Sequence, residues 1–535
     1  MSVEPVQTEF GRKTRIHQSS CNKDFSCVKG FCPSFLTITP NPAPASAGKK
    51  VKKGRIPALE RDLPTPVNKV DDSIGFSIHV MGIGGTGSVT VVATLANAAR
   101  LEGKHVIGLD QTGLAQKGGA VISDIKISHA PFKGSNKISD GRSDLYLGFD
   151  ILNATDPKNL DKCGNERTIA VVSTTQTPTG QMVANRHVSF PAVNGLVAGI
   201  NRVSRAEHNV FLDGQAMAEG LFGDAMATNN FMVGVAFQAG TIPLKAESIE
   251  QAIKNSGVAV DMSLAAFRWG RMVVVDRAFV EAEIARAKAG GSVITLNVAP
   301  KLSATAQAIV DAIGTQGEVK RLVEIRVPEL IAFQDESYAR RYADVIQRVV
   351  AAERRVLPGA SALSEAAARY LYKLMAYKDE YEVARLHTDP AFLAELDVQF
   401  PQGYSVKYNL APPMLAKTDP ATGHLQKQQY GAWMGKAFQR IARLKGWRGG
   451  ALDFFGKSEE RQTERALIEE YIAQLDQIVA KLNADNHAAA VALASVPDEI
   501  RGYGHVKEKS LAAAKRLHDE RLQAFRNPSL ETQVA

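Results

Sequence analysis

The sequence has few cysteines and lacks any long apolar run. Only 4 of its 535 residues are cysteine, so the disulfide framework of a small secreted domain is not expected. No run of roughly 18 apolar residues occurs, which argues against a membrane-spanning helix. The first twenty residues contain Glu4, Arg12 and Arg15 but no apolar block, unlike a secretory signal. We therefore expect a cytoplasmic protein that does not bind a membrane.

The remaining composition is that of an ordinary folded protein, with 45% hydrophobic and 22% charged residues. The chain is too long for one hydrophobic core, so several domains are expected. Of the net charge of +8, residues 1–72 carry a large share, with twelve Lys or Arg against seven Asp or Glu. Such a basic region suits an acidic protein as well as a nucleic acid. Because no nucleic-acid-binding motif is present, we predict no nucleic-acid partner.

The order of residue types along the chain predicts four regions. Residues 1–40 hold three of the four cysteines, and residues 41–73 are rich in Pro and Lys and are predicted to be an extended linker. From residue 74 to about 300, β-type runs at 78–81, 105–110, 120–127, 145–149, 168–173 and 209–212 alternate with helical patterns. This alternation predicts a Rossmann-like α/β domain with a mostly parallel sheet. Residues 330–530 carry apolar side chains at spacings of three and four, which predicts a mainly α-helical domain.

A glycine-rich loop follows the first β-type run of the α/β domain. Its glycines have the G-x-G-x-x-G spacing and are Gly82, Gly84, Gly85 and Gly87. Such a loop permits a tight turn and presents helix N–H groups to a phosphate. Asp110 ends the next β-type run, near where a ribose-binding acid is expected. Local pattern alone leaves two possibilities open, a dinucleotide site and a turn that only makes a compact strand–helix unit.

Three of the four cysteines, Cys21, Cys27 and Cys32, lie within twelve residues. Thiolates at this spacing can converge on one iron–sulfur cluster, and Gly30 allows the segment to fold tightly around it. A cluster normally takes four ligands, so a zinc site and three unrelated thiols remain alternatives. The fourth cysteine, Cys163, is predicted to be a partly buried thiol, although it is also a candidate for the missing ligand.

Several segments resemble a known enzyme family. Residues 81–87, 110–119 and 265–271 are similar to the gamma domain of the 2-oxoacid:ferredoxin oxidoreductases. The cysteine segment resembles the one that precedes this domain in large fused indolepyruvate:ferredoxin oxidoreductases. Leu410-Ala-Pro-Pro413, Asp453-Phe-Phe-Gly456 and Gly502-Tyr-Gly-His505 resemble the C-terminal extension of those enzymes.

The resemblance implies an oxidoreductase component. The family reaction is the oxidative decarboxylation of a 2-oxoacid such as indolepyruvate with coenzyme A, which gives an acyl-CoA and passes electrons to ferredoxin. The implied cofactors are a [4Fe–4S] cluster, with Cys21, Cys27 and Cys32 as candidate ligands, and thiamin diphosphate with magnesium, which supports the bond-breaking step. The sequence contains no Gly-Asp-Gly thiamin motif and no ferredoxin-like run of four cysteines. We therefore expect an oligomer in which a partner binds thiamin diphosphate and shares the cluster.

The resemblance also changes the expectation for the glycine loop. It favours a loop that shapes a coenzyme A channel or stiffens the contact with the thiamin half. Gln116 and Lys117, between Gly113 and Gly119, are predicted to contact that interface or an anion, with a plain surface loop as the alternative.

Two other classes of function stay open, an NAD(P)-binding enzyme and a non-catalytic scaffold remnant. Basic residues of the helical region, such as Arg440, Arg443 and Lys445, are predicted to form a solvated face.

Overall fold

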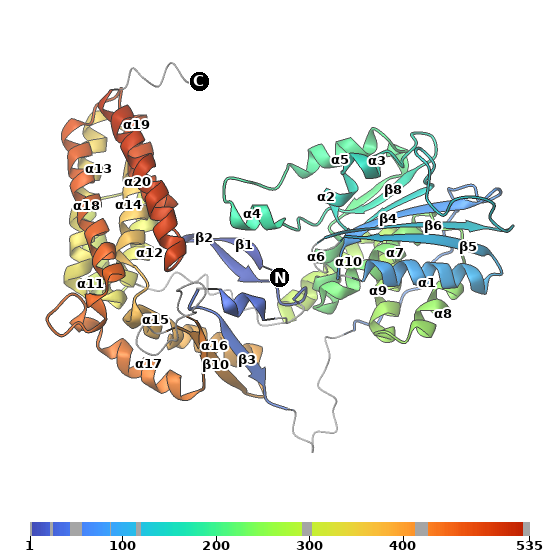
Figure 1. Ribbon diagram of the computed structural model, residues 1–535, viewed down its shortest axis with the longest axis horizontal. Coiled ribbons are helices and arrows are strands. Elements are labelled where there is room, and N and C mark those ends of the chain that lie inside the picture. The colour runs from blue at the N-terminus through green and yellow to red at the C-terminus, as the bar shows by residue number, and fades with distance from the viewer. Residues whose placement is uncertain are drawn as a thin grey trace. The chain divides into compact units, whose positions relative to one another are not determined.

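The computed structural model describes residues 3–21, 25–30, 32–42, 56–85, 87–113, 119–290, 302–411 and 426–527. The chain divides into two compact units (Figure 1). The first unit comprises Met1–Gln7, Arg12–Asp24 and Ser46–Val293, and the second comprises Thr8–Gly11, Phe25–Ala45 and Ile294–Ala535. Near the N-terminus, β1 (Val3–Thr8) and β2 (Gly11–Ile16) pair in a small sheet of their own.

The first unit is built on a six-stranded sheet. Its strands are β4 (Phe76–Ile83), β5 (His105–Thr112), β6 (Ala120–Ser128), β7 (Leu145–Gly148), β8 (Ile169–Ser173) and β9 (Val210–Leu212). In the order β5-β6-β4-β7-β8-β9, strands β4, β7, β8 and β9 run parallel, while β6 is antiparallel to both of its neighbours. The prediction of a mostly parallel sheet is confirmed, with β6 as the exception.

Helices cover both faces of this sheet (Figure 1). They are α1 (Ser88–Leu101), α2 (Ile151–Ala154), α3 (Pro157–Leu160), α4 (Gly180–Ala184), α5 (Val193–Asn201), α6 (Gly214–Phe222), α7 (Thr228–Gln238), α8 (Ala246–Ser256), α9 (Val260–Val275) and α10 (Arg277–Gly290), with the 3₁₀ turns η2 (Ala206–His208) and η3 (Ala225–Ala227). Because strand side chains alternate between faces, Ile78 and Val80 of β4 join the core under α1 and α7, whereas Met81 joins the core under α2 and α5.

Residues 214–238 form two helices rather than one. A helical pattern spans residues 215–237, but α6 ends at Gly223, whose φ is 68°. The Asp224 side chain then accepts a hydrogen bond from the Met226 amide and starts a new turn. A left-handed glycine followed by a capping carboxylate ends one helix and begins another, which periodicity alone does not reveal.

Residues 56–73, in the second half of the predicted linker, contain no helix or strand and are part of the first unit. The Trp269 indole donates to the Pro57 carbonyl at 3.0 Å, and the Gln238 amide donates to the Pro64 carbonyl at 2.9 Å. The Lys69 amide donates to the Gly240 carbonyl at 2.8 Å. This stretch is therefore bound along its length by helices α7 and α9.

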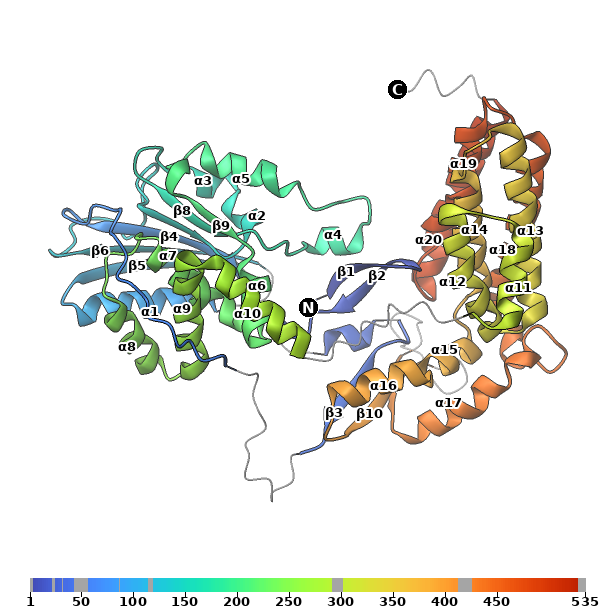
Figure 2. The ribbon, with the colours of Figure 1, turned by 180° about the vertical axis from the view of Figure 1, so that it is seen from behind.

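The second unit is mainly a helical bundle (Figure 2). Its helices are α11 (Ala304–Ile313), α12 (Gly317–Phe333), α13 (Glu336–Val356), α14 (Ala362–Met375), α15 (Glu380–His387), α16 (Pro390–Gln399), α17 (Trp433–Arg443), α18 (Glu459–Lys481), α19 (His487–Ala494) and α20 (His505–Arg526), with 3₁₀ turns η1 (Ser26–Lys29), η4 (Lys445–Trp447), η5 (Phe455–Lys457) and η6 (Val496–Glu499). Tyr342, Ile346 and Val349 of α13 are buried as their spacing predicts, so the helical expectation is confirmed.

A small sheet interrupts this helical unit. Strand β10 (Tyr404–Leu410) pairs with β11 (Gln428–Tyr430) on one side and with β3 (Leu36–Pro40) on the other. The β3 pairing is antiparallel and sets Leu36 opposite Tyr408 and Pro40 opposite Tyr404. The part of the cysteine segment that holds Cys27 and Cys32 is thus in the second unit.

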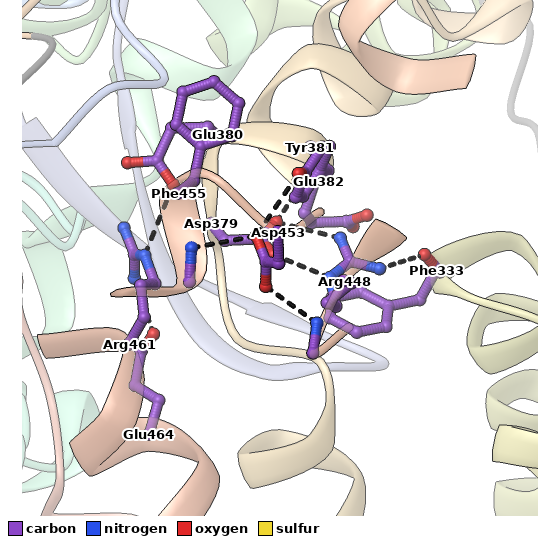
Figure 3. Close-up of polar contacts among 12 residues, drawn as sticks. Phe333, Asp379, Glu380, Tyr381, Glu382, Arg448, Asp453, Phe455, Arg461 and Glu464 are labelled. Carbon is purple, nitrogen blue, oxygen red and sulfur yellow. Dashed lines mark hydrogen bonds and ion pairs between the residues drawn. The ribbon is translucent and has the colours of Figure 1, made fainter. Parts of the chain in front are cut away.

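A buried polar network ties the loops of the second unit together (Figure 3). Arg448 and Asp379 form a two-pronged ion pair, with Nε–Oδ2 at 2.6 Å and Nη2–Oδ1 at 2.8 Å, and both side chains are buried. Asp453 accepts hydrogen bonds from the amides of Gly449 and Gly456 at 2.7 and 2.8 Å. A Cβ on Gly456 would lie 2.0 Å from the Asp453 carboxylate. Both end residues of the Asp453–Gly456 motif therefore have a structural role. Asp453 accepts the loop amides, and Gly456 leaves room for its carboxylate.

Among the described residues, no helix is both long and apolar enough to span a bilayer.

Candidate functional site

The glycine loop lies at the carboxyl end of β4 and leads directly into α1. A Cβ on Gly82 would lie 2.2 Å from the Ser88 hydroxyl, so this glycine lets the helix start close to the strand. Gly85 and Gly87 adopt φ values of 86° and 93°, which glycine tolerates best. The Gly84 amide donates to the Gly119 carbonyl at 2.8 Å. The loop is therefore a tight turn whose glycines are fixed by packing and by backbone conformation.

This turn lies at the strand from which later strands are added first on one side and then on the other. From β4 the chain passes through α1 to β5 and β6 on one side, and then crosses to β7 on the other side. In open α/β sheets such a switch point is where ligands bind. Asp110, however, lies on the edge strand β5, with β6 between it and β4, and accepts a hydrogen bond from Ser123 of β6. It is two strands, about 10 Å, from the strand that carries the glycine loop.

The described ends of the segment 113–119, Gly113 and Gly119, lie at the same end of the sheet as the glycine loop. Its last residue, Gly119, is bound by Gly84, and Ala120 pairs with Ile83. Gln116 and Lys117 lie outside the described residues. The chain thus brings the two glycine-rich segments of the sequence to one end of the sheet.

Asp150 follows β7 and lies at the same end of the sheet. It is a buried acid that no sequence pattern indicated. Its carboxylate caps α2 by accepting from the Asn153 amide at 2.8 Å. Its other oxygen, Oδ2, has no partner among the described residues. Burial raises the pKa of Asp150 to about 6. Only its position after a buried strand could have indicated it.

A groove of about 870 Å³ lies at the opposite, amino end of the strands. It is lined by charged residues of both signs, including Arg142, Asp144 and Arg167, and by Cys163. Burial raises the pKa of the Cys163 thiol to about 12. A thiol this hard to ionise is a poor metal ligand, so the expectation of an inert buried cysteine is the one that its surroundings favour.

The three clustered cysteines belong to different units. Cys21 is in the first unit, and the residues just before it are bound to α6, where His17 Nε2 lies 3.0 Å and Ser19 Oγ 2.8 Å from Glu219. Cys27 lies in η1 and Cys32 before β3, both in the second unit, and both are half-buried. The described structure therefore places two of the three thiols in one environment.

Two residues from the far end of the sequence surround Cys27 and Cys32. Lys427 donates through Nζ to the Cys32 carbonyl. Burial lowers the pKa of Lys427, and the nearby thiols of Cys32 and Cys27 act in the opposite direction because a thiolate would stabilise the ammonium. Burial, followed by the Cys32 thiol, raises the pKa of Tyr503. The two cysteines thus have a lysine and a phenol hydroxyl as neighbours, which are groups that can stabilise a thiolate.

The segment after Cys32 is held by two side chains of the second unit. His387 Nε2 lies 3.1 Å from the Pro33 carbonyl, and the Asn409 amide donates to the Phe35 carbonyl at 3.2 Å and to Thr37 Oγ1 at 3.1 Å. Burial lowers the pKa of His387, which favours its neutral form. The sequence pointed only to Gly502-Tyr-Gly-His505, without a chemical role, and gave no signal for Lys427, His387 or Asn409.

The part of the chain that the structure describes contains no group of three or more His, Cys, Asp or Glu side chains that could hold a metal ion. Cys27 and Cys32 both lie near Lys427, and an iron–sulfur cluster normally takes four ligands.

Two family models match separate parts of the chain. One, described as pyruvate ferredoxin/flavodoxin oxidoreductase, matches residues 77–273, which is the sheet-containing part of the first unit. The other, described only as a family of unknown function, matches residues 319–520 in the second unit.

Similar proteins match the first unit over almost their full lengths. The indolepyruvate oxidoreductase subunit IorB of Methanothermobacter thermautotrophicus is 25% identical over 199 residues, 37% of this chain and 96% of that protein. The subunit of the same name from Archaeoglobus fulgidus is 26% identical over 198 residues, 36% of this chain and 92% of that protein. The solved pyruvate oxidoreductase subunit PORC of Thermotoga maritima is 19% identical and covers 37% of this chain and 97% of its own, with a TM-score of 0.28.

Proposed function

We propose that this chain is the electron-relaying component of an indolepyruvate oxidoreductase, with residues 77–273 as a gamma-type domain of the 2-oxoacid:ferredoxin oxidoreductases. The observation that carries the proposal is the match of this domain to nearly whole indolepyruvate oxidoreductase subunits. Those relatives are named as subunits, which supports a partner chain for this protein as well.

The proposed reaction converts an arylpyruvate and coenzyme A into an acyl-CoA thioester and carbon dioxide. The carboxylate leaves as carbon dioxide, the thiol of coenzyme A loses its proton as the C–S bond forms, and two electrons pass to ferredoxin. Thiamin diphosphate, bound with magnesium by the partner, supplies the electron sink for bond breaking. The residues of this chain bind and orient the reactants and relay the electrons.

We assign the relay to the cysteine segment. Cys21, Cys27 and Cys32 are the proposed ligands of a [4Fe–4S] cluster completed by the partner. The nearby charge of Lys427 supports this role, because it offsets the negative charge of thiolate ligands in a half-buried site. The Nε2–H of His387, which donates to the Pro33 carbonyl, and the side-chain amide of Asn409 keep the backbone after Cys32 in place.

The glycine loop and the segment with Gln116 and Lys117 are the proposed contact for coenzyme A or for the thiamin-binding partner. The glycine loop lies at the switch point of the sheet, and Gly119, a described end of the segment, is bound there by Gly84, which supports this role. An NAD(P) site is less well supported, because β6 separates Asp110 from β4 and Asp110 is bound to Ser123. A dinucleotide titration of the purified chain tests this alternative directly.

The relay is tested by metal content. The chain is purified anaerobically with its partner, and iron and acid-labile sulfide are measured for the wild type and for Cys27→Ser, Cys32→Ser and Cys163→Ser. We expect about four irons for each complete [4Fe–4S] site in the wild type. Cys27→Ser and Cys32→Ser should lose most of this iron, and Cys163→Ser should keep it because that thiol is buried in the first unit.

An iron-free wild-type complex, or equal iron in all four proteins, would contradict the relay. An iron-free protein that still binds its partner would instead favour a scaffold role.

A further inference from the structure

One stretch of the second unit is strongly and uniformly basic. Residues 420–452 contain no Asp or Glu and six basic residues, which are Lys427, Lys436, Arg440, Arg443, Lys445 and Arg448. A run of this kind is costly to pack, because each cation needs a counter-charge or a set of oxygen acceptors when it is buried. The structure divides the six cations into two groups of three.

The first three are used inside the unit. Lys427 binds the Cys32 carbonyl, Arg448 pairs with Asp379, and Lys445 Nζ donates to the carbonyls of Ile331 and Ala332 at 3.0 and 2.8 Å. Lys445 was predicted to lie on a solvated face, but its ammonium group is instead bound by two backbone carbonyls.

The other three cations lie on the surface. Lys436, Arg440 and Arg443 are exposed, and none of them is within ion-pair distance of a carboxylate among the residues that the structure describes. Within α17, Trp433 and these three cations recur at spacings of three and four, which places them on one side of the helix, and Trp447 follows in η4. Trp433 is 59% exposed and Trp447 is 42% exposed. We call these five residues the α17 stripe, and it extends over about 20 Å.

The opposite side of α17 is already occupied. Met434 and Phe438 are buried in a core with Tyr408 and Leu410 of β10. An interfacial membrane helix inserts its apolar side into the bilayer, and here that side is packed inside the protein. The α17 stripe is therefore available to a protein partner but has no apolar face for a lipid surface.

The α17 stripe is close to the cysteine segment. The ring of Phe438, on the buried side of α17, stacks on the His387 ring with 5.3 Å between centroids. His387 in turn lies 3.1 Å from the carbonyl of Pro33, the residue after Cys32. Figure 2 shows α17 beside β10 and β3, the strand that follows this segment. Helix α17 and the His387 ring thus connect the stripe to the backbone next to Cys32.

We propose that the α17 stripe is the docking surface for a small acidic electron-carrier protein. Unpaired cations attract an acidic surface and raise its association rate. Trp and Arg are the residues that most often contribute the binding energy of an interface. The proposal rests on the proposed function, because it gives the electrons of the cysteine segment a nearby exit.

The test uses the full chain with its partner and an acidic [4Fe–4S] ferredoxin as the probe. Lys436→Glu, Arg440→Glu and Arg443→Glu are combined in one variant. The matched control combines Lys509→Glu, Lys515→Glu and Arg516→Glu on the exposed surface of α20, with the same change in charge. Reduction of the ferredoxin and of methyl viologen is measured at low and high salt, and circular dichroism checks the fold of both variants.

We expect the stripe variant to lose at least tenfold in kcat/KM for ferredoxin at low salt and to keep its rate with methyl viologen. The control should keep both rates, and the difference should shrink at high salt because exposed charges are screened. Equal ferredoxin rates in stripe and control variants would overturn the docking proposal. Binding of RNA that depends on the stripe, with ferredoxin unaffected, would also overturn it.

A wild-type complex that reduces neither acceptor would instead contradict the proposed function. The two failures are therefore distinguishable.

Discussion

Two glycines determine how the carboxyl end of β4 meets the start of α1. Gly82 is needed for the close approach of Ser88, and Gly87 for its left-handed backbone at the start of α1. The sequence predicted these glycines because their spacing is a local pattern. Asp150 could not be predicted in the same way, since burial of a lone carboxylate depends on how β4 and β7 pair.

Asp150 makes the stability of the first unit depend on pH. Burial raises its pKa from 3.8 to about 6, so the fold favours the protonated carboxyl. The protonated Asp150 carboxyl therefore contributes fully to the free energy of unfolding below about pH 4. This contribution is lost as pH rises through 6. Asp150→Asn removes the charge and keeps an oxygen for the Asn153 amide. Between pH 4 and pH 8 we expect the stability of this variant to improve, relative to the wild type, by about 2–3 kcal/mol.

Urea unfolding at several pH values measures this effect. Trp433→Phe and Trp447→Phe leave Trp269 as the sole tryptophan, so its fluorescence reports on the first unit. Asp156→Asn, at the exposed cap of α3, controls for the loss of a formal charge. A stability difference for Asp150→Asn that stays constant with pH would contradict the assignment.

Elements far apart in the sequence meet through few polar contacts in the second unit. Asp379 caps the start of α15 and binds Arg448, whose guanidinium carbon also lies 3.7 Å from the Phe333 ring centroid at the end of α12. The ion pair is thus the common contact of α12, α15 and the loop after η4, as Figure 3 shows. The sequence resemblance identified the Asp453–Gly456 motif but not Asp379 or Arg448, because their pairing spans 69 residues.

Arg448→Met should destabilise the second unit by about 3–5 kcal/mol, because it leaves the buried Asp379 carboxylate without its partner. The double variant Arg448→Met, Asp379→Leu should recover part of this loss, since no buried charge remains. Thermal unfolding measures both. Arg340→Met breaks the exposed pair with Glu336 and should cost less than about 1 kcal/mol. Similar costs for Arg448→Met and Arg340→Met would show that the network is not structurally important.

At the scale of the whole molecule, the sequence predicted local structure well and long-range pairing poorly. All six strands of the large sheet lie within two residues of their predicted positions, because alternation and apolar runs are local signals. The pairing of β3 with β10 joins residues more than 360 positions apart, and the contact of Lys427 with Cys32 spans 395. No periodicity encodes such register, so the attachment of the cysteine segment to the C-terminal unit was not predicted.

The central claim is that electrons from a 2-oxoacid reach the cysteine segment of this chain. It is tested most directly by the visible absorption spectrum of the anaerobic complex before and after indolepyruvate and coenzyme A are added together. We predict that the iron–sulfur absorption bleaches in the wild type and in Cys163→Ser but not in Cys32→Ser. No bleaching in the wild type, or equal bleaching in Cys32→Ser, would contradict the account.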